Sequence, residues 1–437
     1  MGTGKCLGRE RPAQEPPMRN LSLPALTAVL VSTAAGAQTA PVQAPYTLQT
    51  QPGARSGGGT VNDVALWVNP ANPSASRLIT ADQNNGLFTY ALDGGELQAV
   101  TEGTSSSVDV LGGFPLAGGT SAALVLSASP TLQGLVPYVM DATADGGGLT
   151  RLSPTVAPLD VGVTYGTVRM ARGVDGTIQA FGGLAAGGIR QFALTPTDGG
   201  VTATPLRDIP AGTVLGLAVD PAYRALYVAQ QGQGLYRYGS DADAGITGTQ
   251  VVGLGDGGLT SVGRIALYEA SGTDGYVVAS DPNANTFVVF DRRTLGRVGS
   301  FQLVQDGGTD AVEQSRGLVA FSGALGTAFP EGLFVAHDGM SSSTLGDNVK
   351  LTSWGNVARA FSPPLIIAQQ QADAGTDGGT GQDGGGGGVI KPGDQNPIGS
   401  GGGTDDDSGC GCTSTSVPAV ATLGLLAMAL LGRRRRG

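Results

Sequence analysis

The sequence predicts an all-β protein and, more narrowly, a six-bladed β-propeller. Three observations support this: the 437 residues include 74 glycines, aromatic residues make up only 5%, and one type of strand recurs along the chain. Many short strands joined by glycine-rich turns are typical of sandwiches, barrels and propellers. A repeat of about 50 residues that holds four short strands is typical of a propeller blade.

The recurring strand alternates apolar and polar residues, contains an aromatic residue and ends at a turn. Its aromatic residues follow one another at intervals of 46 to 54 residues and are Tyr90, Tyr138, Phe192, Tyr238 and Phe290. Apolar segments precede these strands, and six are present: ALWV, AALVLSAS, TIQAFGGL, ALYVAQQ, GYVVASD and GLFVAHD. They predict six blades between about Ala44 and Ala368. A sandwich array with repeated hairpins is the alternative, but sandwiches lack so regular a period.

The stretch 61–100 shows one repeat in detail. Val64–Val68 alternates as a half-buried strand does, and Asn69-Pro70 breaks the pattern. Leu87–Leu92 reads as another strand, and Asp93-Gly94-Gly95 after it is typical of a hairpin turn in which glycine takes the positive φ. This repeat therefore predicts strands joined by tight turns.

The first 37 residues predict a secretory signal peptide. Met18–Asn20 opens a short positive region, Leu21–Ala35 is apolar, and Ala35-Gly36-Ala37 is a small-residue cleavage site. Residues 1–17 read as an upstream, mis-called start, because Met18 begins a better signal. The mature protein would then begin near Gln38, and the propeller would occupy residues 38–368. A cytosolic protein with an unusual N-terminus is the alternative.

The C-terminal part predicts a linker followed by an anchor. Residues 369–409 are acidic and glycine-rich and cannot bury a core. Residues 410–437 combine Cys410-Gly411-Cys412, the apolar run Val417–Leu431 and the cluster Arg433–Arg436. The apolar run is short for a transmembrane helix, which needs roughly 17–25 residues, and the arginines would fix its end on the cytoplasmic side. A disulfide or a metal pair is the alternative for the two cysteines, although the sequence places no histidine near them.

This order of linker, cysteine pair, apolar helix and arginine block resembles the C-terminal sorting segment of myxobacterial surface proteins. The resemblance implies an exported protein anchored at the cell surface or outer membrane, with its folded part on the extracellular face. The net charge of −10 at pH 7 argues against nucleic acid as a partner, because nucleic-acid binding requires a basic face. We expect a monomer that meets the membrane only through this anchor.

Six stretches of the folded part resemble, in the same order, stretches of the β-propeller phytases. They are Asn62–Val68, Ser106–Val110 and the ranges 216–238, 275–292, 330–339 and 348–358, and they span about Tyr46–Phe361. The resemblance implies a six-bladed, calcium-dependent 3-phytase that releases phosphate from myo-inositol hexakisphosphate, or phytate. In such enzymes carboxylates at the mouth of the channel hold several Ca²⁺ ions, which neutralise the substrate phosphates and activate a water.

The same resemblance implies site residues. Asp63, Asp109 and Asp310 would be calcium ligands, Asp338 would hold a turn or a structural Ca²⁺, and Tyr165 matches a tyrosine that contacts the substrate. Other carboxylates of the family pattern are replaced in this chain, by Asn62, Leu215, Gln230-Gln231, Thr260–Gly263, Gln314 and Arg316. Calcium takes six to eight oxygen ligands, so we expect fewer bound ions than in the family. An active and an inactive phosphatase site both stay open, and no catalytic residue is assigned.

Two further residues are interpreted from their chemistry. Arg316 stands at an acidic position of the family pattern, and its guanidinium could bind a substrate phosphate directly, since this group holds oxyanions with two hydrogen bonds. The alternative is a rim arginine paired with Glu313 or Asp310. His337 has no Ser or Cys nucleophile motif beside it, and we expect a structural residue that faces a turn.

Two functions of different classes remain. One is a surface-anchored phosphomonoesterase of the phytase type, which uses calcium and acts on phytate or another phosphorylated small molecule. The other is a non-catalytic propeller that binds a ligand or a protein partner at the cell surface. The fold does not decide between them, because function depends on the site that the fold carries.

Overall fold

The computed structural model describes most of the part of the chain that was expected to fold. The described residues are 1–2, 40–50, 60–116, 121–141, 148–152, 158–198, 200–256, 258–306, 310–339 and 347–368. All the described residues belong to the first of two units of the chain, Met1–Ala374. The predicted cleavage site, the linker 369–409 and the anchor 410–437 lie outside them. In the described part, no helix has the length and apolarity needed to cross a membrane.

Six antiparallel sheets follow one another along the chain, as the repeat predicts. The first three sheets are β3 (Val61–Trp67), β4 (Arg77–Asp82), β5 (Gly86–Ala91) and β6 (Glu96–Val100); β7 (Ser107–Pro115), β8 (Ser121–Ser129), β9 (Gly134–Met140) and β10 (Leu149–Arg151); and β11 (Tyr165–Arg172), β12 (Ile178–Leu184), β13 (Ile189–Thr197) and β14 (Gly200–Ile209). The 3₁₀-helix η1 (Pro73–Ala75) lies in the turn between β3 and β4. Each sheet has the four-stranded form of a propeller blade.

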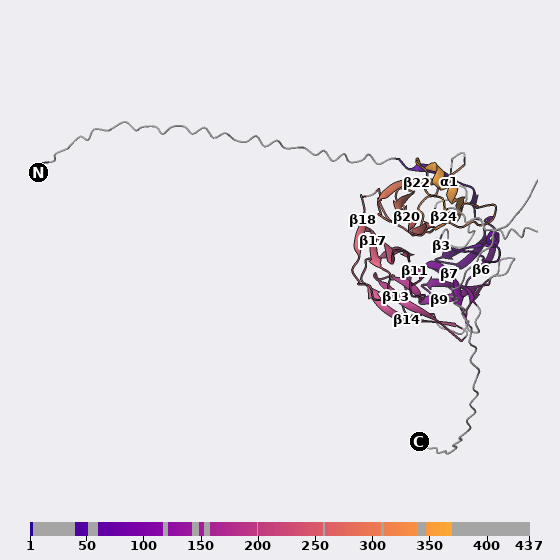
Figure 1. Ribbon diagram of the computed structural model, residues 1–437. Coiled ribbons are helices and arrows are strands. Elements are labelled where there is room, and N and C mark those ends of the chain that lie inside the picture. Colours follow the sequence, from indigo (N-terminus) through magenta and orange to yellow (C-terminus); the bar gives the residue numbers. More distant parts are fainter. Residues whose placement is uncertain are drawn as a thin grey trace, which may run out of the picture. The chain divides into compact units, whose positions relative to one another are not determined.

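The last three sheets complete the set. Their strands are β15 (Val214–Asp220), β16 (Ala225–Gln230), β17 (Gly234–Gly239) and β18 (Thr249–Gly253); β19 (Ile265–Ser271), β20 (Asp274–Asp281), β21 (Thr286–Asp291) and β22 (Arg297–Gln305); and β23 (Leu318–Phe321), β24 (Leu333–Asp338) and β25 (Asn348–Ser353). The first strands of the six sheets contact one another in the order β3, β7, β11, β15, β19 and β23, and β23 contacts β3 again. The sheets therefore form a closed ring around these inner strands, which is a six-bladed propeller (Figure 1).

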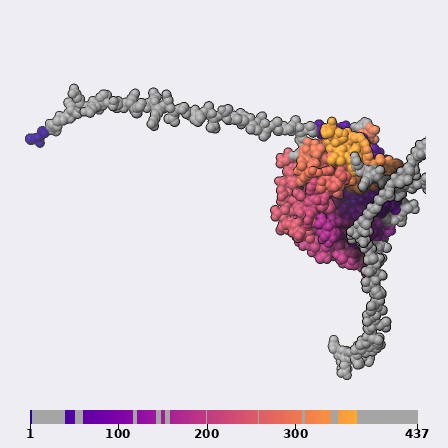
Figure 2. Space-filling model, viewed as in Figure 1, coloured from indigo at the N-terminus to yellow at the C-terminus, as the bar shows by residue number. Residues whose placement is uncertain are grey.

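The N-terminal strands close the ring. β1 (Val42–Tyr46) runs parallel to β22, the outer strand of blade 5, and β2 (Leu48–Gln49) pairs antiparallel with β25 as the outer strand of blade 6. Blade 6 thus takes one strand from the start of the fold and three from its end. The space-filling view shows the last described part of the fold, in orange and yellow, beside the first described strands, in indigo (Figure 2). Such a closure joins the two ends of the fold through backbone hydrogen bonds.

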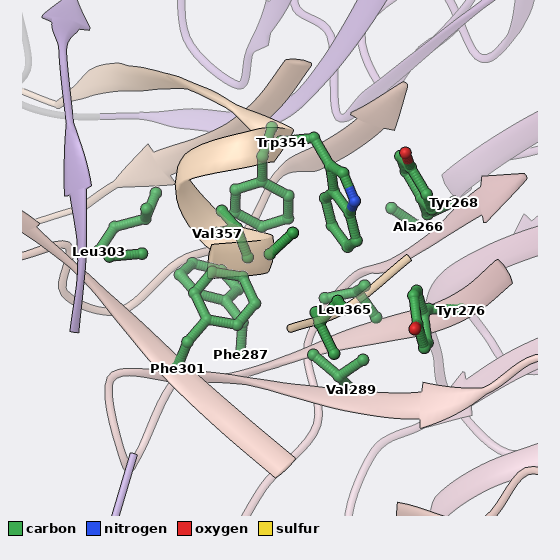
Figure 3. Close-up of a cluster of buried hydrophobic side chains, with 14 of the residues drawn as sticks. Ala266, Tyr268, Tyr276, Phe287, Val289, Phe301, Leu303, Trp354, Val357 and Leu365 are labelled. Carbon is green, nitrogen blue, oxygen red and sulfur yellow. The ribbon is translucent and has the colours of Figure 1, made fainter. Parts of the chain in front are cut away.

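The core lies between neighbouring blades. The five aromatic residues of the recurring strand are all buried, as expected of the side that faces the next sheet. A second aromatic cluster joins blades 5 and 6 through α1 (Trp354–Ala360), where Trp354 stacks on Tyr268 with ring centroids 3.9 Å apart (Figure 3). The Trp354 Nε1 donates to the Ile366 carbonyl at 2.9 Å, so the last described segment is fixed beside the same cluster. This packing fixes the inner strands, whose first residues surround the axis.

The six predicted apolar segments do not all hold the same place in their blades. Five of the six predicted apolar segments are the second strands of their blades, but ALWV belongs to β3, the first strand of blade 1. The second strand of that blade is β4, and every residue of it is buried. An arginine and an aspartate bound it, so its sequence does not read as a continuous apolar run. The six-bladed architecture itself is confirmed.

Candidate functional site

A cavity of about 840 Å³ opens at the end of the axis where the inner strands begin. Its lining residues come from the starts of inner strands and from the turns between the second and third strands of the blades. Six of them carry side-chain amides: Asn62, Gln83, Gln231, Asn283, Asn285 and Gln314. The charged residues among the described lining residues are Arg264 and Arg316, and none of these lining residues is a carboxylate. We call this cavity the upper pocket.

Arg316 presents a free guanidinium at the upper pocket. It is exposed, and its side chain has no hydrogen bond or ion pair to any residue in the described part of the chain, Glu313 and Asp310 included. Its backbone is held from both sides. The Arg316 backbone N–H donates to His337 Nδ1 at 3.1 Å, and its carbonyl accepts from Arg264 Nε at 2.8 Å. The backbone that carries the Arg316 side chain is therefore held in place by two hydrogen bonds.

His337 is a structural residue, although it does not face a turn as expected. It is buried in β24, and its Nε2 lies 3.1 Å from Asp347 Oδ2. Because Nδ1 accepts the Arg316 N–H, Nε2 carries the proton and donates it to Asp347. Asp347 also accepts the backbone N–H of Val61 at 3.1 Å. His337 thus ties the loop before β23 to the first residue of β3.

Asp63 lies fully buried at the axis with every acceptor site in use. The Arg169 guanidinium donates to it twice, from Nη1 to Oδ2 at 2.9 Å and from Nη2 to Oδ1 at 3.2 Å. Ser107 Oγ donates to Oδ2 at 2.5 Å, and the Val64 N–H donates to Oδ1 at 3.0 Å. A carboxylate has about four lone-pair sites, so protein donors fill them all.

The charges around Asp63 decide its protonation. Burial by itself would raise the pKa of Asp63, but the positive charges of Arg169 and Arg264 and the hydrogen bonds of Arg169 and Ser107 outweigh it and lower the pKa. Arg264 Nε is 3.8 Å from Asp63 Oδ1. Arg264 also donates from Nη2 to the carbonyls of Asn62 and Ser106, at 3.2 Å each, while its buried Nη1 has no hydrogen-bond partner in the described structure. One arginine N–H group beside the upper pocket is therefore unpaired.

Asp109 lies on the other side of this cluster. It lines a second cavity of about 370 Å³, together with aliphatic residues of the inner strands, and does not line the upper pocket. Its Oδ2 accepts the Met170 N–H at 2.6 Å. Burial raises the pKa of Asp109 to about 6, against the lowering effect of Arg169 and of the backbone hydrogen bonds from Met170 and Val110. We call this second cavity the lower chamber.

Asp310 and Asp338 share a buried lysine. The Lys350 ammonium is 2.9 Å from Asp310 Oδ2 and 3.4 Å from Asp338 Oδ2, and it donates to Gln49 Oε1 at 2.6 Å. Tyr46 Oη donates to Asp310 Oδ2 at 3.0 Å, and this bond together with burial raises the pKa of Tyr46. The group lies where β2 meets β25, and neither aspartate lines the upper pocket.

Tyr165 is buried at the start of β11, and the next residue, Gly166, lines the upper pocket in its place. The Tyr165 hydroxyl donates to Asp160, and its ring meets Phe192 edge-on with centroids 6.4 Å apart. A contact between Tyr165 and substrate stays a prediction. Of the six residues named from the sequence, the structure brings Arg316 to the upper pocket and places the other five elsewhere.

The donor set does not fit the multi-ion calcium cluster that the resemblance implies. Across the described ranges, no three His, Cys, Asp or Glu residues come close enough to hold one metal ion together. The four predicted ligands do not converge on one point: Asp310 and Asp338 lie together at Lys350, apart from Asp63 and Asp109. Three of them are bonded to a protein cation: Asp63, Asp310 and Asp338. Calcium needs six to eight oxygen ligands that converge on one point. No step of a reaction is therefore derived through calcium.

The sequence reasoning missed Arg169, Arg264 and Lys350. Each lies within or next to a strand and is the one charged residue of a short stretch: TVRMA in β11, GRIAL at β19 and NVKLT in β25. A charged residue at such a position is a signal, because charges are rarely buried without a partner. Their partners are between 12 and 201 positions away along the chain. Which residues pair with one another could therefore be identified only from the folded structure.

Three comparisons place the chain among known proteins. A crystal structure of BBS1N in complex with ARL6DN, soaked with lead, superposes with a TM-score of 0.39 at 11% identity, covering 67% of this chain and 79% of that one, which is too low to support an argument. A 3-phytase of Bacillus subtilis (strain 168) is 27% identical over 319 residues, which is 70% of this chain and 82% of the relative. The family model described as phytase matches residues 17–374, most of the chain. The chain belongs to the phytase family.

Proposed function

We propose that this protein binds a phosphorylated small molecule, phytate or a close relative, through direct side-chain contacts in the upper pocket. The observation that carries the proposal is the composition of the pocket wall. It offers the free guanidinium of Arg316, the positive charge of Arg264 and six side-chain amides, without a carboxylate among the described lining residues. Membership of the phytase family and the similarity to a 3-phytase support phytate as the first ligand to try.

The chemistry of the wall suits phosphate groups. A guanidinium holds an oxyanion with two charge-assisted hydrogen bonds, and a side-chain amide can add N–H donors, although the Asn62 Nδ2 already donates to the Ser106 carbonyl at 2.7 Å. Carboxylates in the wall would repel a polyanion unless metal ions lay between them, and this wall has arginines and amides instead. A volume of about 840 Å³ falls within the roughly 300–1,000 Å³ that small-molecule sites have.

Hydrolysis by the calcium-dependent route is the second candidate. Family membership and the 27% identity to a 3-phytase favour it. That route needs several ions held by converging carboxylates. Asp63, Asp310 and Asp338 are bonded to arginine or lysine. We therefore propose that fewer calcium ions bind than in the family, and that bound phytate is not hydrolysed by the calcium-dependent route.

The site of action is also part of the proposal. The signal peptide expected over residues 1–37 and the sorting segment expected over 410–437 support export and anchoring at the cell surface. Cell fractionation with N-terminal sequencing tests this, and we expect a surface-exposed chain that begins near Gln38. Removal of residues 410–437 should release the protein into the medium. An unprocessed chain in the cytoplasm would contradict the proposal.

Calorimetric titration of phytate into the full chain tests the binding. We expect binding in the presence of chelator, and an affinity about 10–100-fold lower for Arg316→Met, because a hydrogen bond to a charged group contributes about 1.5–3 kcal/mol. Arg293→Met is the matched control, since Arg293 is exposed, pairs with Asp274 at 2.7 Å and follows β21, at the opposite end of that strand from Asn285. Equal losses in both variants, or binding only with calcium, would contradict the proposal.

A further inference from the structure

The buried ion cluster of Asp63, Arg169 and Arg264 lies between the two cavities of the axis. Asn62 lines the upper pocket and Val64 lines the lower chamber, so Asp63 falls between them on β3. Arg264 lines the upper pocket and Arg169 the lower chamber in the same way. The described cavities are therefore separated by this cluster, which closes the axis at the level of Asp63.

The cluster joins most of the ring. Asp63 comes from blade 1, Arg169 from blade 3 and Arg264 from the start of blade 5. Ser107 of blade 2 donates to Asp63, and the carbonyl of Arg316, just before blade 6, accepts from Arg264. One carboxylate and two guanidinium groups thus connect five of the six blades across the axis. A bound divalent ion would connect oxygen ligands from different blades in the same way.

We infer that Arg169 and Arg264 are built-in cations that take the part of a bound metal at the axis, so that this propeller folds without calcium. Among the described residues, the donor set does not match the calcium cluster that the family resemblance implies. Asp63 keeps its charge in a buried place because two arginines neutralise it, and its acceptor sites are filled by protein donors. A metal ion brought to Asp63 would have to displace the guanidinium of Arg169 or that of Arg264, whose side chains are only 12% and 5% exposed.

The charge balance inside the axis supports the same conclusion. The carboxylates of Asp63 and Asp109 face the guanidinium groups of Arg169 and Arg264, two charges of each sign. Burial by itself would lower the pKa of Arg169, but the negative charges of Asp63 and Asp109 and the hydrogen bond to Asp63 outweigh it and raise the pKa above its ordinary value. An added dication would leave this buried group with excess positive charge, which is unfavourable in a low-dielectric interior.

Thermal unfolding of the full chain tests the inference apart from any ligand. We expect the same Tm with chelator and with added calcium. Arg169→Met should lower the Tm by roughly 6–20 °C, because it leaves a buried carboxylate without its main partner. Arg172→Met is the matched control on β11, since Arg172 is exposed and bonds carbonyls of Gly112 and Gly113. It should have a much smaller effect.

A second experiment tests whether removing the arginines makes the Tm respond to calcium. The double variant R169M/R264M leaves Asp63 and Asp109 without their cations, so calcium should raise its Tm while leaving that of the unaltered protein unchanged. Where the double variant does not fold, the comparison of the unaltered protein with and without chelator decides alone. A Tm of the unaltered protein that falls with chelator and rises with calcium would overturn the inference. So would an Arg169→Met protein as stable as the Arg172→Met control.

Discussion

Arg169 and Asp63 form a two-pronged ion pair at the axis of the ring, with 2.9 Å between Nη1 and Oδ2 and 3.2 Å between Nη2 and Oδ1. The pair joins blade 1 to blade 3, which are not neighbours in the ring. Since the carboxylate is fully buried, its charge depends on this contact, on Arg264 and on Ser107. The contact links the stability of the fold to the chemistry of the axis, and the predictions below follow from it and from the groups around it.

Asp63→Asn tests the charge of this residue through the pH dependence of stability. The pKa of Asp63 is lowered in the folded protein, so its ionised form contributes stability above the unfolded value of about 4, and that contribution is lost as the pH falls through the folded pKa. We expect the difference in unfolding free energy between the unaltered protein and Asp63→Asn to shrink below about pH 4. Urea unfolding at a series of pH values measures it. A difference that does not change with pH would contradict the pairing.

Asp109→Asn should show the opposite dependence. The pKa of Asp109 is raised to about 6, so the folded state prefers its protonated form. The stability from that preference is present below the unfolded pKa and is lost as the pH rises through about 6. Asparagine keeps an acceptor for the Met170 N–H, so Asp109→Asn should gain stability over the unaltered protein as the pH rises from 4 to above 6. The same urea series measures this gain. If no gain were found, the fold would not disfavour the ionised form of Asp109.

Lys350→Met should destabilise the fold by about 3–5 kcal/mol, the typical cost of breaking a buried ion pair. The substitution removes the ammonium that lies 2.9 Å from Asp310 and 3.4 Å from Asp338. Tyr46→Phe is the milder companion, since it removes one hydrogen bond to Asp310 and should cost about 1–3 kcal/mol. Chemical denaturation at neutral pH compares the two. If Lys350→Met were as stable as Tyr46→Phe, the ammonium would not hold the aspartates.

His337→Phe should weaken phytate binding although His337 does not line the upper pocket. It removes the acceptor for the backbone N–H of Arg316, so the backbone that carries the guanidinium is no longer held in place. His337→Asn is the matched control, because its amide oxygen takes the position of Nδ1 and can accept the same hydrogen bond. We expect a several-fold loss of affinity in the Phe variant and a smaller loss in the Asn variant. Equal affinities in calorimetry would show that this hydrogen bond does not position Arg316.

The sequence predicted the ring but not its axis, for a physical reason. Side-chain alternation and turn glycines lie within single repeats, so the 46–54 residue period could be read directly. The axial ion cluster joins positions 63, 169 and 264, and such pairings depend on ring closure. The only sign of these pairings in the sequence was a charged residue in an otherwise uncharged stretch of a strand.

Tyr165 illustrates why single site residues were harder to place than strands. Successive side chains of a strand point to opposite faces, so a neighbouring position changes the surroundings entirely. Gly166 lines the upper pocket while Tyr165 packs on Phe192 in the core. Arg316 was named as a substrate-binding residue from its place in the family pattern and its chemistry, and it lines the upper pocket just before β23. Its contact with a phosphate group stays a prediction.

Phosphate release from phytate by the full chain, measured with chelator and with added calcium, tests the central claim most directly. The claim is that protein cations hold the carboxylates that would otherwise bind calcium, so that the upper pocket binds phosphate groups without calcium-dependent hydrolysis. We predict no release under either condition from a protein that binds phytate in both. Calcium-dependent release would contradict the account, because Asp63, Asp109 and Asp310 would then have exchanged their protein partners for calcium.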